Sequence, residues 1–542
     1  MFGVITVLGF AASRWRRPEA AFDQKWGLEE WGLGGRAFGN GICFFLLGGD
    51  VYTAYTLVAL PALVYGLGAP GFFPVAFLAI TYPLIYVALP RMWSVAHVHG
   101  FVTPAEFVRA RFGSSPLAVL VACTTIIATM PYIAVQLVGM RAVFQAMGIT
   151  GDIPLILAFG LLAFFTFNSG LRAPALLAIV KDLMLMATVL IVLLLLTITQ
   201  GGWGHVFSAA STQFAHSKGG SLLLPANAQL SYVTLALGSA MALFLYPHTM
   251  TGVLASRNRA TVKRSLSLLP VYTLMLGLFA LFGFAAISAG VRPLGGNSTT
   301  ILPQLLQTNL NGWGAGLCFA ALSIGALVPA SIMSIGAANL FTRNIYRVFF
   351  KRDATAGQET QVSRIASLVV KLGALAVIVS INVGNAIDLQ LMGGCVLLQV
   401  FPAVALGLYT NWFHRRALIA GLIAGLVSGV AMLYQIPGTD ASGKVISRHF
   451  GGDSWPLSHL GLDTKASIYV GLVALVVNLG VAASLTWACR WLGVPRGRDM
   501  TDPSDYTADE HDTTVRRMSE LIDGELPRQA KHARRGGVAA VR

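Results

Sequence analysis

The stretch 41-GICFFLLGGDVYTAYTLVALPALVYG-66 places a carboxylate, Asp50, directly after two glycines in one of the most apolar parts of the chain. A charged side chain at membrane depth costs roughly 2.5–3.5 kcal/mol on insertion scales, so such an acid indicates a functional site. Paired glycines let a membrane helix break, which frees backbone carbonyls to bind a cation or polar solute. The stretch therefore predicts a discontinuous helix with an ion or substrate site. The alternative is a carboxyl that is hydrogen-bonded inside a helix bundle.

The composition is that of a polytopic membrane protein. Of 542 residues, 55% are hydrophobic and 11% charged, with a mean hydropathy of +0.68, whereas a soluble domain carries about 25% charged residues. The net charge of +15 is spread over alternate loops, which argues against a nucleic-acid partner and for a lipid bilayer. The cysteines lie in apolar segments without close pairs and predict neither disulfides nor a metal site: Cys43, Cys123, Cys318, Cys395 and Cys489.

Hydropathy predicts one transmembrane domain, 1–492, of thirteen spans. The span 1–12 is too short to cross a ~30 Å hydrocarbon layer, so we expect the first helix to extend beyond Met1. The mixed charges of 493–542 predict a disordered cytoplasmic tail. The spans are 1–12, 38–66, 71–90, 115–147, 152–170, 173–199, 229–256, 266–289, 312–345, 362–383, 384–411, 417–435 and 466–492.

The loops predict the orientation. One alternate set carries twenty Lys and Arg residues, beginning at Arg14 and ending at Arg416, while the opposite set carries five, Lys218, Arg292, Lys444, Arg448 and Lys465. The positive-inside rule places the richer set in the cytoplasm. The N-terminus is then outside and the C-terminus inside, as an odd number of spans requires.

A second break is predicted in 235-LALGSAMALFLYPHTMTGVLAS-256. Pro247 lacks a backbone donor, which frees a carbonyl about one turn earlier, near Leu243. Tyr246 and His248 flank this opened backbone, which favours a substrate gate over a histidine that is simply satisfied in the core.

The two breaks predict an all-α inverted repeat. They are separated by four spans, so the core 38–411 divides into halves 38–199 and 229–411, each of five helices that open with a discontinuous one. An odd number of spans per half forces opposite orientations, which is the design of secondary transporters with a midplane site.

Further polar side chains lie at membrane depth. Each is a candidate for substrate binding and, alternatively, for ordinary hydrogen bonding between helices. Asp182 lies mid-depth with Lys181 before it, but adjacent helix positions do not face each other, so the sequence does not indicate an ion pair. The uncharged candidates are Tyr52, Tyr55, Tyr132, Gln136 and Gln399.

Over nearly its whole length the chain resembles the solute:sodium symporter family, most of all its bacterial monocarboxylate permease branch. The resemblance implies a LeuT-like fold of ten core helices plus peripheral ones, in a bacterial cytoplasmic membrane. It is carried, in order, by 31-WGLGGRAFG-39, 47-LGGDVYTAYTLVALPALVYGLGAPGF-72, 93-WSVAHVHGFVTPAEFVRARFGS-114, 169-SGLRAPALLAIVKD-182, 246-YPHTMTGVLAS-256, 339-NLFTRNIYR-347 and 399-QVFPAVALGLY-409.

The resemblance also implies site residues. Asp50 matches the acid of the first core helix, and the carbonyls of Gly48 and Val51 match sodium ligands. Asp182 matches the acid of the fifth core helix, and His248 falls at a gating position of the sixth.

One departure concerns the coupling ion. The family completes its sodium site with two hydroxyl residues on the eighth core helix, where this chain has Val328 and Pro329. Ser323 and Ser331 are near but out of register. Because burial disfavours a charged carboxylate, Asp50 or Asp182 is an alternative carrier of a coupling proton.

The sequence thus predicts a symporter that imports a small monocarboxylate such as acetate, pyruvate or lactate with Na⁺ or H⁺, and that has no cofactor. The alternative solute is another small molecule such as an amino acid. An enzyme is disfavoured because His97 and His99 have no further ligands nearby. A sensor is disfavoured because the tail holds no signalling domain.

Overall fold

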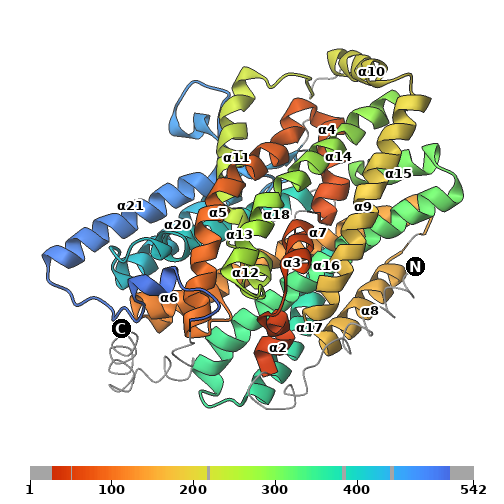
Figure 1. Ribbon diagram of the computed structural model, residues 1–542. Coiled ribbons are helices and arrows are strands. Elements are labelled where there is room, and N and C mark those ends of the chain that lie inside the picture. The colour runs from red at the N-terminus through yellow and green to blue at the C-terminus, as the bar shows by residue number, and fades with distance from the viewer. Residues whose placement is uncertain are drawn as a thin grey trace.

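The computed structural model describes residues 27–50, 52–149, 151–216, 220–380, 386–439 and 445–512. In this part the chain is almost entirely helical, with two small antiparallel hairpins, β1–β2 and β3–β4 (Figure 1). Their bounds are β1 (Gly438–Thr439), β2 (Val445–Ser447), β3 (Ser454–Pro456) and β4 (Ser467–Tyr469).

Eight helices of the described chain are long and apolar enough to cross a membrane, or nine if one bent pair counts as a span. Three shorter apolar helices, Asn40–Gly49, Thr56–Leu67 and Ile153–Ser169, lie among them. The chain is therefore a multi-pass membrane protein, as its composition predicts. The structure does not confirm the expected count of thirteen, since 1–12 lies outside the described residues and 38–66 forms two short helices.

The first half of the bundle begins with a short helix and then the broken span. Its elements are α2 (Gly27–Leu33), α3 (Asn40–Gly49), η4 (Tyr55–Ala59), α4 (Leu60–Leu67), η5 (Ala69–Phe72), α5 (Phe73–His99), α6 (Pro104–Phe112), α7 (Ser115–Ala146), α8 (Ile153–Ser169) and α9 (Arg172–Thr199).

The second half follows the peripheral helix α10 (Trp203–His216). Its elements are α11 (Gln229–Leu243), α12 (Pro247–Leu254), α13 (Arg259–Leu268), α14 (Pro270–Ser288), α15 (Ile301–Asn309), α16 (Gly312–Phe341), η8 (Thr342–Phe350), α17 (Ala356–Ser380), α18 (Ala386–Leu397), η10 (Leu398–Val400), α19 (Phe401–Val404), η11 (Leu406–Leu408), α20 (Arg415–Gln435) and α21 (Val470–Trp491).

The first predicted break lies where the paired glycines place it. Helix α3 ends at Gly49, and helical structure resumes near Tyr55 as the π-helical turn η4 before α4. Side chains satisfy the backbone in between: the Thr56 hydroxyl accepts from the Thr53 N–H at 2.9 Å, and Gln136 Oε1 of α7 accepts from the Ala54 N–H at 2.8 Å. The unwound segment is therefore held by neighbouring polar groups, as buried backbone requires.

The second break follows from Pro247. Helix α11 ends at Leu243, Tyr246 is extended (φ −61°, ψ 142°), and α12 starts at Pro247 with its axis bent by 44°. The Leu243 carbonyl lies 3.4 Å from the Tyr246 N–H and 3.5 Å from the Thr249 hydroxyl, which both point to it as donors. Pro247 thus starts a new helix at its first position, where no donor is needed.

Helix α16 runs through the centre of the bundle, and every residue of it from Ala321 to Leu340 is buried. It packs against α7, α9, α12 and α17, so both broken spans lie beside it. Close approach needs small residues: a Cβ on Gly325 would lie 2.4 Å from Leu57, and one on Gly336 would lie 2.9 Å from Pro247. These glycines let α16 touch both breaks.

Residues 495–512, which we call the C-terminal strap, pack along one end of the bundle. Met500 N–H donates to the Ala110 carbonyl at 2.9 Å, and His99 Nε2 lies 2.8 Å from Asp505 Oδ2. The sequence predicts disorder from Gly493 onward, whereas the strap is ordered by these contacts. Residues 513–542 lie outside the described part of the chain.

Candidate transport site

The carboxyl group of Asp50 lies at the end of α3 and is 4% exposed. Neither of its oxygens has a hydrogen-bond partner among the described residues. It lines a cavity with Thr81 and Tyr82 of α5 and Thr249 of α12, surrounded by leucines and phenylalanine. A buried acid without a protein partner is costly, so this position suits a ligand or a proton.

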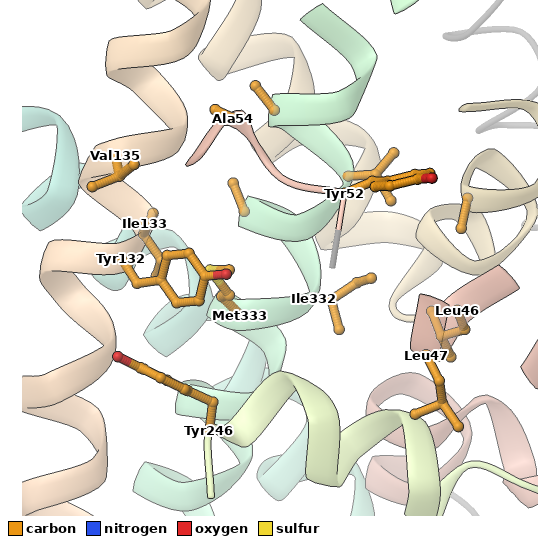
Figure 2. Close-up of a cluster of buried hydrophobic side chains, with 14 of the residues drawn as sticks. Leu46, Leu47, Tyr52, Ala54, Tyr132, Ile133, Val135, Tyr246, Ile332 and Met333 are labelled. Atoms are coloured by element: carbon orange, nitrogen blue, oxygen red, sulfur yellow. The ribbon is translucent and has the colours of Figure 1, made fainter. Parts of the chain in front are cut away.

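A second polar group forms at the other break. The ring of Tyr132, one residue after Pro131 in α7, lies 5.1 Å from the Tyr246 ring and 5.4 Å from the His248 ring. Figure 2 shows Tyr132 and Tyr246 lying next to each other beside α16. The Tyr246 hydroxyl and both His248 nitrogens are buried and unpartnered within the described chain. We call Asp50, Tyr132, Tyr246 and His248 the midplane cluster, after the depth that the sequence predicts for the site.

Tyr52 packs against α14 rather than against the tyrosines of the second break. Its ring lies 4.8 Å from that of Tyr272 and 6.0 Å from that of Phe279, both on α14. In Figure 2 it points away from Tyr132 and Tyr246. The structure therefore does not bring Tyr52 together with Tyr132, although the sequence groups them as contacts of one solute.

The structure pairs Lys181 with Asp182, which helical spacing alone did not indicate. Lys181 Nζ lies 2.9 Å from Asp182 Oδ1, and both side chains are fully buried. A lysine side chain is long enough to curl back toward its neighbour, and burial makes the unpaired charges costly. Lys181 Nζ also donates to the carbonyls of Gly49 at 2.8 Å and Tyr52 at 3.0 Å. Asp182 accepts in addition from the Tyr272 hydroxyl at 2.7 Å.

The carbonyls that accept from the Lys181 ammonium are each one residue later in the chain than those that the resemblance implies as sodium ligands. The contacts come from Gly49 and Tyr52, whereas Gly48 packs against Tyr272, where a Cβ would lie 2.1 Å from the ring. Val51 lies outside the described residues, and Tyr55 opens the turn η4.

Gln136 and Gln399 both form hydrogen bonds to groups of the protein. Gln136 accepts from the unwound segment through Oε1 and donates through Nε2 to the Tyr132 carbonyl at 3.2 Å. Gln399 lies elsewhere, where its Nε2 donates to the Cys395 and Gly471 carbonyls and its own carbonyl accepts from Asn478 of α21 at 2.7 Å. Gln399 therefore joins the contact between η10 and α21 rather than the midplane cluster.

His97 and His99, which lie in the last turn of α5, contact the C-terminal strap. His97 Nε2 lies 3.1 Å from the Asp512 carbonyl, and His99 faces Asp505. Within the described residues no three His, Cys, Asp or Glu side chains are grouped to hold a metal ion. The described cysteines are free thiols.

Sequence reasoning missed the roles of Tyr272 and Lys181. Tyr272 lies in an apolar span, where an aromatic residue is typical of a packed core. The sequence carried one signal for Lys181, namely its position at mid-depth. The free-energy cost of an unpaired ammonium there is no lower than that of a carboxylate.

Two broken helices that place unpartnered polar groups beside a central buried helix are typical of secondary transporters. A family model for the sodium:solute symporter family matches residues 31–425. The chain belongs to the sodium:solute symporter family, and this membership identifies a symporter rather than an enzyme.

Named relatives agree with the family. The chain is 45% identical over 482 residues to a "monocarboxylate transport permease protein" of Rhizobium johnstonii, covering 89% of this chain and 94% of that protein. It is 33% identical over 434 residues to the "uncharacterized symporter YodF" of Bacillus subtilis, covering 78% and 84%. A solved Na⁺-coupled sialic acid symporter in a substrate-bound, outward-open state has the same fold, with a TM-score of 0.71, 15% identity and coverage of 91% and 97%.

Proposed function

We propose that this chain imports small monocarboxylates, such as acetate, pyruvate or lactate, together with a cation by alternating access. The observation that carries the proposal is the midplane cluster, in which the buried polar atoms of Asp50, Tyr246 and His248 find no protein partner in the described chain. The name of the Rhizobium johnstonii relative supports the substrate class. Because the solute is an anion, moving a cation with it offsets electrical work of ~2.3 kcal/mol per charge per 100 mV.

The solute carboxylate binds at the start of α12, beside Tyr246 and His248. The first N–H groups of a helix have no partner within it, and they carry a positive partial charge that favours an anion. The Tyr246 hydroxyl and the His248 ring supply further hydrogen bonds, since both are buried without a protein partner in the described chain. The small acyl group then packs against the Tyr132 ring.

The breaks also support the mode of transport. Each opens one of the halves 38–199 and 229–411, which we propose to be inverted repeats that rock around the central site. The basic loops and the C-terminal strap then lie in the cytoplasm of a bacterial cell, and the N-terminus lies outside.

Counterflow in reconstituted vesicles tests the substrate class. Vesicles preloaded with unlabelled acid should accumulate labelled acetate, pyruvate or lactate, while labelled alanine and proline should not exchange. Exchange of an amino acid with no exchange of any acid would assign the site to the alternative solute. Exchange of none of them would overturn the proposed function.

A further inference from the structure

The Lys181 ammonium sits on the backbone of the broken helix. Its Nζ contacts the carbonyl oxygens of Gly49 at 2.8 Å and Tyr52 at 3.0 Å and the Asp182 carboxylate at 2.9 Å. Carbonyls freed by a helix break, together with a carboxylate, are the oxygen ligands that a small hard cation takes in such transporters. In this chain the same oxygens contact the ammonium of Lys181, which is fully buried.

The neighbouring face of α16 carries no oxygen-bearing side chain at this depth. Helices α9 and α16 are antiparallel, since both the start of α9 and the end of α16 reach α2, through the pairs Arg172–Glu30 and Asn339–Gly32. They meet where a Cβ on Gly325 would lie 3.5 Å from Leu185.

Lys181 of α9 lies about one turn, or about 6 Å along the helix axis, closer to α2 than that contact. Val328 and Pro329 of α16 lie at the same depth. Both α16 residues are buried and apolar. The next hydroxyl, Ser331, is turned toward α8, where it accepts from Thr166 and donates to the Leu327 carbonyl. The side-chain oxygens that would complete a sodium site on α16 are thus missing at the place where a lysine supplies its own charge.

A sodium ion and the ammonium exclude each other at this position. They would share the same two carbonyls, and like charges at contact distance repel strongly away from water. The titratable groups around Lys181 come from its own helix, the broken helix, α5 and α14, and they are Asp50, Tyr52, Tyr82, Asp182 and Tyr272. Lys181 is the cation among them.

We propose that Lys181 is the resident cation of this site and carries the coupling proton, so that this symporter works without sodium. The inference rests on the proposed function and names its coupling ion. The amine of Lys181 takes a proton from external water when the site faces outward and releases it to cytoplasmic water when the site faces inward. One proton that moves with one carboxylate carries no net charge across the membrane.

The wild-type protein provides the first test. Uptake of labelled pyruvate or acetate into vesicles should be unchanged when sodium is replaced by a bulky organic cation. It should be driven by an inside-alkaline pH gradient, lost with a protonophore, and insensitive to a potential set with potassium and valinomycin. Uptake that disappears without sodium would overturn the inference and leave the proposed function standing.

Sodium binding to the purified protein provides a test that needs no transport. A ligand that binds only the folded state raises its melting temperature. Sodium and potassium chloride should have equal effects on the wild type, whereas Lys181→Met, which leaves the Gly49 and Tyr52 carbonyls and Asp182 without a cation, should gain a stabilisation specific to sodium. Sodium-specific stabilisation of the wild type would overturn the inference.

Lys371→Met is the matched control. Lys371 on α17 is also buried, but it donates to the Ser367 hydroxyl at 2.8 Å rather than to the broken helix. It should gain no response to sodium and should keep uptake driven by a pH gradient, which Lys181→Met should lose. If Lys181→Met keeps that uptake, Lys181 does not carry the proton. If the variant fails to fold, the sodium tests on the wild type still decide.

Discussion

Two buried polar regions of this transporter are built in opposite ways. In the midplane cluster, the Asp50 carboxylate, the Tyr246 hydroxyl and the His248 ring have no protein partner within the described chain. In a second region, which we call the ion cluster, Glu106 of α6 and Glu359 of α17 meet Arg343 and Arg347 of η8. There Arg347 lies 2.8 Å and Arg343 3.3 Å from Glu359, and Arg343 lies 3.9 Å from Glu106.

The difference separates function from architecture. Charges that pair across three elements fix those elements relative to one another, and they leave no net demand for a ligand. Polar groups that are buried without partners lower stability unless something else binds them. Both regions are buried and polar, so the pairing is what distinguishes these two regions from each other.

The largest expected effect is on transport through Asp50. Asp50→Asn keeps the shape of the side chain but removes its charge and its ability to hold a proton. Coupled uptake into vesicles should fall to background, while the melting temperature should not decrease, because no protein group loses a partner. Uptake at the wild-type rate would remove Asp50 from the site.

The second-largest effect is expected in the ion cluster, where a substitution should lower stability and leave the transport site intact. Glu359→Gln leaves Arg343 and Arg347 buried without their shared counter-charge, which costs about 3–5 kcal/mol for a broken buried pair. A thermal unfolding scan should show a clear drop. Glu510→Gln is the control, since its partner Arg257 lies 3.8 Å away and is 69% exposed, and exposed pairs contribute about 0–1 kcal/mol. Equal effects of both substitutions would contradict this reading.

A smaller effect is expected at Gln136. This side chain holds the unwound segment beside the site, and we expect that it does not contact the solute. Gln136→Leu leaves the Ala54 N–H without its acceptor, a buried loss of about 1–3 kcal/mol. We expect slower transport together with a lower melting temperature. A change in apparent solute affinity alone would instead place Gln136 in contact with the solute.

The smallest change in stability is expected at the Tyr246 hydroxyl. Tyr246→Phe removes one hydrogen bond to the charged solute carboxylate, worth about 1.5–3 kcal/mol, so the concentration for half-maximal uptake should rise by roughly 10–150-fold. Because this hydroxyl has no protein partner in the described chain, stability should not fall. A destabilised variant with unchanged affinity would show that the hydroxyl is structural.

The sequence predicted the positions of the helix breaks better than it predicted which side chains contact one another. Gly48–Gly49 and Pro247 act through the local backbone, so their effect on the helices can be predicted from neighbouring residues alone. The positions of Asp50, Tyr246 and His248 beside those breaks followed directly. Membrane character followed from composition, and the family from motifs spread along the chain.

Contacts between distant residues could not be predicted in the same way. Gln399 and Gln136 look alike in sequence, yet one bonds α21 and the other the unwound segment, because only packing decides which helix each faces. The Lys181–Asp182 pair was missed because helical spacing describes where side chains start and not where a long chain ends. The ordering of the C-terminal strap depends on partners such as His99 and Ala110, far away in the sequence.

The most direct test of the contrast between the two regions is uptake of a labelled monocarboxylate by reconstituted wild type, Asp50→Asn and Glu359→Gln, each paired with a thermal unfolding scan. The account predicts that Asp50→Asn loses coupled uptake without losing stability and that Glu359→Gln loses stability while the folded protein keeps its uptake. Wild-type uptake in Asp50→Asn, or lost uptake in folded Glu359→Gln, would contradict the assignment of the transport site to the midplane cluster.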